Sequence, residues 1–341
     1  MILILWLANI VAVMACQVPV FRYALERWAP AEYLVSITPS EAGLTDAEKK
    51  AVELLRAAPR DSATPVNLEI EIGQPAPGSH GPAQFTLHYP HKLRDTRKPP
   101  VWQAALTAQN VQRLIDSPVR RELRQRLLTG ESAIWLLVES GDTAKDEAAA
   151  STLTAALANA QSSLKLPDGV ITSADAAKRT GPKANEQADA LRSDLPLKIE
   201  FSVLRLRRAD PEESALLAML THLEDDLGGF AGEPMVFPAF GRGRVLEPLI
   251  GAGINKDNVM EHSGDLCGAC SCEVKDLNPG IDLLITANWE PVDTTPKIEI
   301  IRITPQAETT AVRQPPILAV LAGVIALVVA ALLFRRKPRP H

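Results

Sequence analysis

Apolar and polar positions recur along the middle of the chain with the spacings of helices and strands. Apolar residues recur at helical spacing in 18–28 and 46–57, and Thr45 and Glu48 stand at capping-box spacing before the second segment. Further helices are expected over 106–128, 143–164 and 211–223, with a break in the first near Pro118. Alternating or continuous apolar runs predict strands at 33–37, 66–72, 85–89, 133–138, 198–206, 235–240 and 281–286. Strands that alternate with helices predict an α/β fold with sheets covered on both faces.

The Arg-Lys-Pro-Pro sequence that ends at residue 100 favours a domain boundary at that point. We therefore expect two three-layer α/β domains, 16–100 and 101–290, the second with a polar excursion at 167–196. Residues 291–316 read as a stalk, in which 298–303 has the composition of an edge strand. A chain of this length can build two domains with cores of their own.

The C-terminal end carries the clearest apolar run. Residues 317–334 contain no charged or amide side chain and are followed at once by Arg335, Arg336, Lys337 and Arg339. A helix of this length spans about 27 Å, close to the roughly 30 Å of a bilayer core. This pattern predicts a transmembrane helix at 317–334, and the basic residues place the tail, 335–341, in the cytoplasm.

The N-terminal end is apolar too and agrees with export. Residues 2–15 are apolar apart from Asn9, and Val13 and Ala15 precede Cys16 as the −3 and −1 residues of a signal-peptidase site would. We expect residues 1–15 to be a cleaved signal peptide. Lipidation at Cys16 and an uncleaved helix over 2–21 are the alternatives. In each case the central region lies outside the cytoplasm, so we predict a single-pass membrane protein with an extracytoplasmic, periplasmic bulk.

Charge narrows the range of partners. Four of the 36 Lys and Arg residues lie in the tail, which leaves 32 basic against 41 acidic side chains and a net charge of −9 for the rest. An acidic region argues against nucleic acid as a partner, because nucleic-acid binders carry basic stripes. The membrane and an extracytoplasmic protein are the partners that we expect.

Four cysteines are the candidate site residues: Cys16, Cys267, Cys270 and Cys272. In an exported protein such a set favours structural disulfides, and four cysteines allow three pairings. One of these joins Cys267 to Cys270 and Cys16 to Cys272. A redox-active dithiol is an alternative, because CxxC is the usual spacing for thiol exchange. A Cys₃His zinc site with His262 and inert thiols are the others, and no cofactor or metal is assigned.

The first hundred residues bear a resemblance to thioredoxin-like proteins. Cys16 stands at a helix start, and a strand (33–37), a helix (46–57), a strand led by Thr64-Pro65-Val66, another strand (84–89) and a helix (106–116) follow. The resemblance implies a thioredoxin-like first domain and an exchange role for Cys16. The family's CxxC stands here as Cys16-Gln17-Val18-Pro19, without the second cysteine. CQVPVFRYALERW and CGACSCEVKDLNPGIDLL also resemble segments of uncharacterised exported bacterial membrane-anchored proteins.

Other polar motifs carry less information. Phe240–Arg244 (FGRGR) reads as a glycine turn between a strand and a helix, with solvated arginines or, alternatively, an anion cradle. His80, His88 and His91 read as exposed histidines rather than metal ligands. The chain has no nucleotide-binding or hydrolase motif of known pattern. We expect an extracytoplasmic binding or assembly module, and thiol–disulfide exchange is the alternative function.

Overall fold

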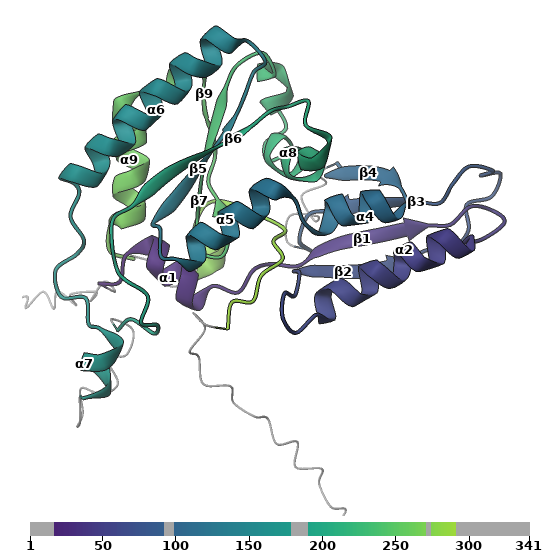
Figure 1. The fold of residues 1–341 in the computed structure, drawn as a ribbon, viewed down its shortest axis with the longest axis horizontal. Coiled ribbons are helices and arrows are strands. Elements are labelled where there is room, and N and C mark those ends of the chain that lie inside the picture. Colours follow the sequence, from purple (N-terminus) through teal and green to yellow (C-terminus); the bar gives the residue numbers. More distant parts are fainter. Residues whose placement is uncertain (1–16, 92–98, 179–189, 271–273, 291–341) are drawn as a thin grey trace, which may run out of the picture. The chain divides into compact units, whose positions relative to one another are not determined.

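The computed structural model describes residues 17–91, 99–178, 190–270 and 274–290. These residues form two β-sheets with helices packed on them (Figure 1). The coarse prediction of a mixed α/β fold is therefore confirmed.

The first sheet has four strands in the order β2-β1-β3-β4. Strands β1 and β2 are parallel and are joined through helix α2, whereas β3 is antiparallel to both of its neighbours, β1 and β4. Helix α4 follows β4. The bounds are β1 (Tyr33–Thr38), α2 (Asp46–Ala57), β2 (Leu68–Ile72), β3 (Gln84–His88), β4 (Trp102–Ala105) and α4 (Ala108–Ile115).

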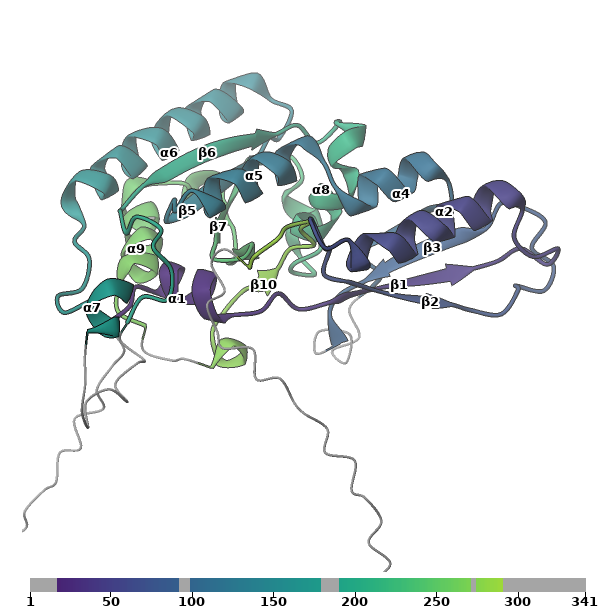
Figure 2. The ribbon, with the colours of Figure 1, turned by 60° about the horizontal axis from the view of Figure 1, so that its bottom comes forward.

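Helices cover one face of this sheet. The predicted capping box begins α2, since the Glu48 N–H donates to the Thr45 hydroxyl and the Thr45 N–H donates to the Glu48 carboxylate. Helices α2 and α4 contact each other on the same side of the sheet (Figure 2). Polar strand residues such as Ser36 and Glu71 occupy the other face, on which no helix of the described chain lies. The three-layer prediction is wrong for this sheet, because the segment between β2 and β3 contains glycine and proline and forms no helix.

The second sheet contains strands β5 to β10. Its strand order is β10-β8-β7-β5-β6, and β9 pairs with the other end of β7. Strands β5 and β6 are parallel, and the other pairs are antiparallel. The bounds are β5 (Ala133–Val138), β6 (Phe201–Leu206), β7 (Met235–Phe240), β8 (Arg244–Val245), β9 (Leu249–Ile250) and β10 (Ile281–Asp282).

Helices pack on both faces of this sheet. Trp135 and Leu137 of β5 join one apolar cluster with residues of α1 (Val20–Arg27), α6 (Thr143–Ser163) and α9 (Lys256–Cys267). Ile134, Leu136 and Val138 join a second cluster with residues of α5 (Pro118–Leu128) and α8 (Ser214–Thr221). Burial from both sides explains why β5 is a continuous apolar run, as the sequence predicted.

The two sheets repeat one order of elements. In each, a parallel strand-helix-strand unit (β1-α2-β2 or β5-α6-β6) is followed by a strand that is antiparallel to its first strand (β3 or β7). A further antiparallel strand (β4 or β8) and a helix (α4 or α9) come next. Helix α8 is inserted between β6 and β7, and the equivalent segment between β2 and β3 is a loop.

The residues of each sheet do not coincide with the predicted domains. Residue 100 lies between β3 and β4, so the first sheet takes β4 and α4 from beyond the expected boundary. Helix α1 precedes β1 in sequence but contacts α9 and β7 of the second sheet. Part of the predicted polar excursion is also packed rather than exposed, because Leu191 and Ser193 are buried against α1.

The last described segment joins the two sheets. The predicted strand 281–286 is a strand only at β10, after which the extended chain contacts the segment that precedes β2, with an isolated bridge between Val66 and Thr286. The Asn67 side chain donates to the Leu283 carbonyl at 3.1 Å and accepts from the Ile285 N–H at 2.9 Å. The buried Arg120 of α5 donates to the Leu284 carbonyl at 3.2 Å, and burial lowers the pKa of its guanidinium to about 10 against the opposing effect of Asp116.

Within the described ranges no helix is both long enough and apolar enough to cross a bilayer. The predicted signal peptide, the stalk, the transmembrane helix 317–334 and the basic tail lie outside those ranges.

Candidate functional site

The turn after the first strand of each sheet holds carboxylates rather than thiols. At the start of α6 the Asp142 carboxylate accepts from two backbone N–H groups of the first turn. Asp146 is buried and accepts from the Ser140 N–H at 2.7 Å, the Ser140 hydroxyl at 2.8 Å and the Gly141 N–H at 3.1 Å. Burial raises the pKa of Asp146, but these hydrogen bonds outweigh it and hold the pKa below its ordinary value.

The start of α2 is also capped by a carboxylate. Glu48 accepts from Thr45 and, at 2.7 Å, from the Ala83 N–H at the edge of β3. Burial raises the pKa of Glu48, and the backbone hydrogen bonds from Thr45 and Ala83 lower it below its usual value. Both positively polarised helix ends therefore have acceptors from within the chain.

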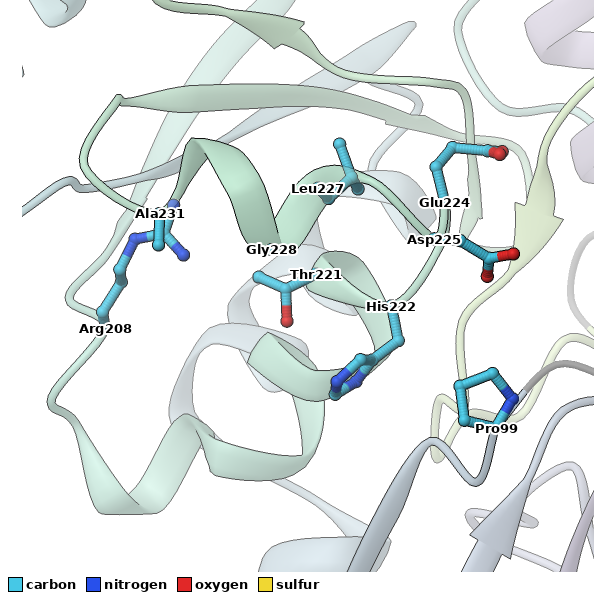
Figure 3. Close-up of a pocket in the computed structure, with 9 residues that line it drawn as sticks. All are labelled: Pro99, Arg208, Thr221, His222, Glu224, Asp225, Leu227, Gly228 and Ala231. Atoms are coloured by element: carbon cyan, nitrogen blue, oxygen red, sulfur yellow. The ribbon is translucent and has the colours of Figure 1, made fainter.

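A pocket of about 380 Å³ lies near the carboxyl end of β6 (Figure 3). Arg208, two residues beyond β6, lies at one side, and His222, Glu224 and Asp225 lie beyond the end of α8. In open α/β sheets, ligands bind in the crevice outside the carboxyl ends of the parallel strands, which is where Arg208 stands.

Arg208 has an incomplete set of hydrogen bonds. Its Nη2 donates to the Glu233 carbonyl at 3.3 Å, whereas its Nε is buried and has no acceptor. Burial lowers the pKa of the Arg208 guanidinium, and the Asp146 carboxylate opposes the shift. Buried donors of charged groups are normally satisfied, and the Nε of Arg208 is one of the few described side-chain atoms that are not.

The two described cysteines, Cys267 and Cys270, are both buried. Cys267 ends α9, is buried and is a free thiol, and no disulfide joins it to Cys270. The local Cys267–Cys270 bridge that the sequence allows is therefore not formed in this structure. Burial raises the pKa of the Cys267 thiol to about 12. Because the thiolate is the nucleophile, Cys267 has the properties of an inert structural thiol.

The segment that contains Cys270 pairs with the start of α1. The Cys270 N–H donates to the Val18 carbonyl at 3.0 Å, and Pro19 forms an antiparallel bridge with Ala269. Cys16 and Cys272 lie outside the described residues.

The FGRGR segment is a hairpin turn and not a strand-to-helix turn. Gly241 and Gly243 adopt positive φ angles of 60° and 91° between β7 and β8. A Cβ on Gly241 would lie 2.7 Å from the Ala24 Cβ, which shows how closely the turn approaches α1. The prediction of a following helix was wrong because the apolar residues after the turn belong to β8 and β9.

The two arginines of this turn are buried rather than solvated. Arg242 donates to the Leu25 carbonyl at 2.7 Å, and Arg244 donates to the Pro279 carbonyl at 2.9 Å and to the Asp282 carboxylate at 3.3 Å. Their donors are directed to groups of the chain itself, and this favours a structural role over an anion cradle.

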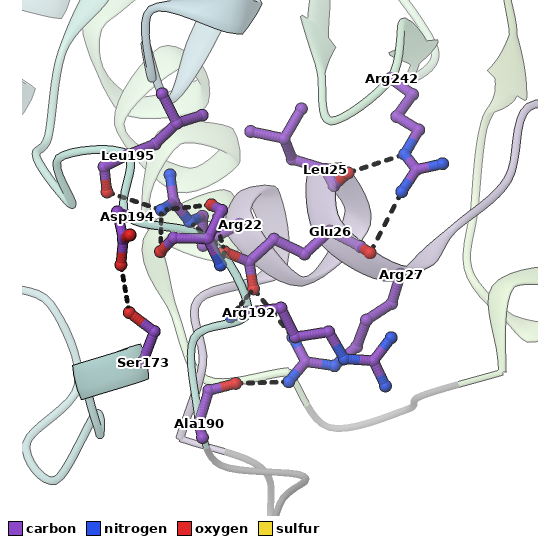
Figure 4. Close-up of polar contacts among 11 residues, drawn as sticks. Arg22, Leu25, Glu26, Arg27, Ser173, Ala190, Arg192, Asp194, Leu195 and Arg242 are labelled. Atoms are coloured by element: carbon purple, nitrogen blue, oxygen red, sulfur yellow. Dashed lines mark hydrogen bonds and ion pairs between the residues drawn. The ribbon is translucent and has the colours of Figure 1, made fainter. Parts of the chain in front are cut away.

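Helix α1 carries a buried ion pair (Figure 4). Arg22 and Glu26 are both fully buried, and Arg22 Nε lies 2.8 Å from Glu26 Oε1. Glu26 also accepts from the Arg192 N–H at 2.7 Å and from the N–H and hydroxyl of Ser193. This network fixes residues 190–195 to α1.

The histidines of the predicted set lie apart. His80 is exposed and 3.8 Å from Glu41, His88 Nε2 is 2.8 Å from the Ser36 hydroxyl, and His91 borders a different pocket. The described residues contain no group of three or more His, Cys, Asp or Glu side chains that could hold a metal ion. His262 lies on α9, where its Nδ1 has no hydrogen-bond partner.

Comparison with protein-family models, with curated proteins and with solved structures finds no match to this chain. The sequence motifs did not point to the pocket at Arg208, although two consecutive arginines, Arg207 and Arg208, directly after a strand are a usable signal in an α/β fold.

Proposed function

We propose that the chain is an extracytoplasmic, membrane-anchored binding or assembly module that does not exchange thiols. The observation that carries this proposal is the chemistry at the helix starts after β1 and β5. Carboxylate caps occupy both positions, and the buried Cys267 has a pKa near 12. A redox-active thiol needs solvent access and a lowered pKa.

The order of elements from β1 to α4 supports a thioredoxin-like first sheet only without the helix at Cys16, because α1 contacts α9 and β7 of the second sheet. A thioredoxin-like sheet has a parallel strand-helix-strand unit, a third strand antiparallel to the rest, a fourth strand and a closing helix. The strand order and directions here agree with that arrangement, in the first sheet without its middle helix. In such a sheet the active-site cysteines begin the first helix, which is the position held here by the caps of α2 and α6.

The membrane anchor rests on the apolar run 317–334 and its basic flank. Before that run, the last described residues, 274–290, hydrogen-bond to Asn67 next to β2 and to Arg120 of α5.

Thiol exchange is tested with the full-length protein in detergent, with glutathione disulfide as oxidant. We expect no turnover above that of a variant with all four cysteines replaced by serine. Turnover that is lost on Cys16→Ser or Cys272→Ser would overturn the proposal in favour of the exchange alternative. Mass spectrometry of unreduced peptides from the same sample determines whether Cys16 and Cys272 are joined.

Topology is tested by protease accessibility of the full chain in cells. We expect cleavage within 22–290 after the outer barrier is permeabilised and protection of a C-terminal tag while the inner membrane is intact. Protection of both regions would place the chain in the cytoplasm and contradict the anchored, extracytoplasmic part of the proposal.

A further inference from the structure

The pocket at Arg208 has opposite charges at its two sides. The Arg208 guanidinium lies on the side of β6, and the Glu224 and Asp225 carboxylates lie on the side of the α8 end (Figure 3). Leu227 and Pro99 contribute apolar surface to the lining. A volume of about 380 Å³ is within the range of small-molecule pockets, roughly 300–1,000 Å³.

The cationic side makes one hydrogen bond within the described chain. Arg208 Nε is buried without a hydrogen-bond partner, and the single bond of Nη2 to the Glu233 carbonyl is long, at 3.3 Å. A carboxylate is the group that best matches a guanidinium, because its two oxygens can accept two parallel N–H bonds. The adjacent Arg207 differs, since its side chain is 77% exposed and lies 3.6 Å from Asp210.

The anionic side lacks a cation. Glu224 and Asp225 are exposed, and neither forms an ion pair with any residue of the described chain. Burial raises the pKa of Tyr89, and the negative charges of these two carboxylates raise it further. An anion alone would be repelled from this side, and a cation alone would be repelled by Arg208.

His222 adds a directed polar group between the two sides. Its Nδ1 lies 2.9 Å from the Ala218 carbonyl oxygen and donates to it, which leaves Nε2 as an acceptor in the neutral ring. An N–H group in the middle of a ligand would find this acceptor.

We propose that the pocket binds a short peptide or a similar zwitterion, with its carboxylate on Arg208 and its ammonium group on Glu224 and Asp225. The inference rests on the proposed binding function and names the ligand class of that function. A free peptide has an ammonium group, a carboxylate and polar amide groups between them. A capped peptide lacks one of the two charged ends, and a simple anion lacks the ammonium group.

The test is calorimetric titration of the full-length protein with triglycine at low salt. N-acetylated triglycine, triglycine amide and free glycine are titrated in parallel. We expect each capped form to bind about 10- to 100-fold more weakly than triglycine, which is the effect of losing one charge-assisted contact. If free glycine binds as tightly as triglycine, the zwitterion assignment holds with an amino acid as the ligand.

Matched variants assign the contacts. Arg208→Gln should weaken triglycine binding by about 10-fold or more, and Arg207→Gln, its exposed neighbour, should leave it unchanged. The double variant Glu224→Gln with Asp225→Asn should act like Arg208→Gln, and Asp226→Asn is its control.

Three results would overturn the inference: no binding of triglycine or glycine, equal binding of capped and free peptides, or equal losses in Arg207→Gln and Arg208→Gln. The capped peptides are measured with the unaltered chain, so this arm does not depend on the folding of a variant. Absence of peptide binding together with absence of thiol exchange refutes only the pocket assignment. Thiol exchange refutes the proposed function itself.

Discussion

Replacement of Glu26 by glutamine tests the buried network of α1. The substitution preserves the shape of the side chain but removes its charge opposite Arg22, and both side chains are fully buried. Both carboxylate oxygens accept hydrogen bonds, Oε1 from Arg22 and Ser193 and Oε2 from the Arg192 N–H. An amide has only one acceptor oxygen, so its NH₂ group would face donors.

The loss follows from that geometry. Removing one partner of a buried, hydrogen-bonded ion pair costs about 3–5 kcal/mol, because the other charge stays buried without compensation. Such a loss is a large fraction of the roughly 5–15 kcal/mol by which a folded domain is stable. We therefore expect Glu26→Gln to lower the midpoint of guanidinium-induced unfolding strongly, without a change in the slope of the transition.

Glu122→Gln is the matched control. Glu122 and Arg126 form an i,i+4 pair in the reverse order, with Oε1 and Nε 2.7 Å apart, but their side chains are 44% and 27% exposed. Exposed helical pairs contribute about 0.3–0.5 kcal/mol. If Glu26→Gln destabilised the protein no more than Glu122→Gln, burial would not be the source of the stabilisation and the reasoning would fail. A double variant with Arg22→Met should lose less than the sum of the single losses, because the two groups are coupled.

Three further outcomes follow from other parts of the structure. Gly280→Ala should destabilise the protein by roughly 2–5 kcal/mol in denaturant unfolding, because φ is 92° and the new Cβ would lie 2.2 Å from the Val245 carbonyl oxygen. The control Gly78→Ala, where φ is 75° and the space around the glycine is open, should cost only ~1 kcal/mol. The pKa of Asp146 is lowered in the folded protein, so its contribution to stability is present above the unfolded pKa of about 3.9 and is lost as the pH falls through the folded pKa. The difference in unfolding free energy between the wild type and Asp146→Asn should therefore narrow from pH 6 to pH 3, and a constant difference would refute this. Cys267 should resist alkylation by iodoacetamide at pH 8 in the native protein and react after unfolding, as measured by peptide mass spectrometry. Rapid alkylation of the native protein at Cys267 would contradict its burial.

Elements with local signals could be predicted from the sequence alone. The capping box at Thr45 and Glu48 begins α2 where predicted, Pro118 separates α4 from α5, and the apolar run 133–138 is a strand buried on both faces. Each of these depends on residues within a few positions of one another, so hydrophobic spacing and capping chemistry suffice.

Contacts between segments that are distant in the sequence could not be predicted in this way. Helix α1 precedes β1 in the chain, yet its apolar residues are buried against α9 and the turn at Gly241, more than 200 residues away. The pocket likewise unites Arg208 with Glu224 and Asp225, because the segment after β6 and the segment after α8 line the same cavity. Such contacts form because apolar surfaces of distant segments are buried against each other. The local sequence pattern shows that a surface is apolar but does not show which other segment covers it.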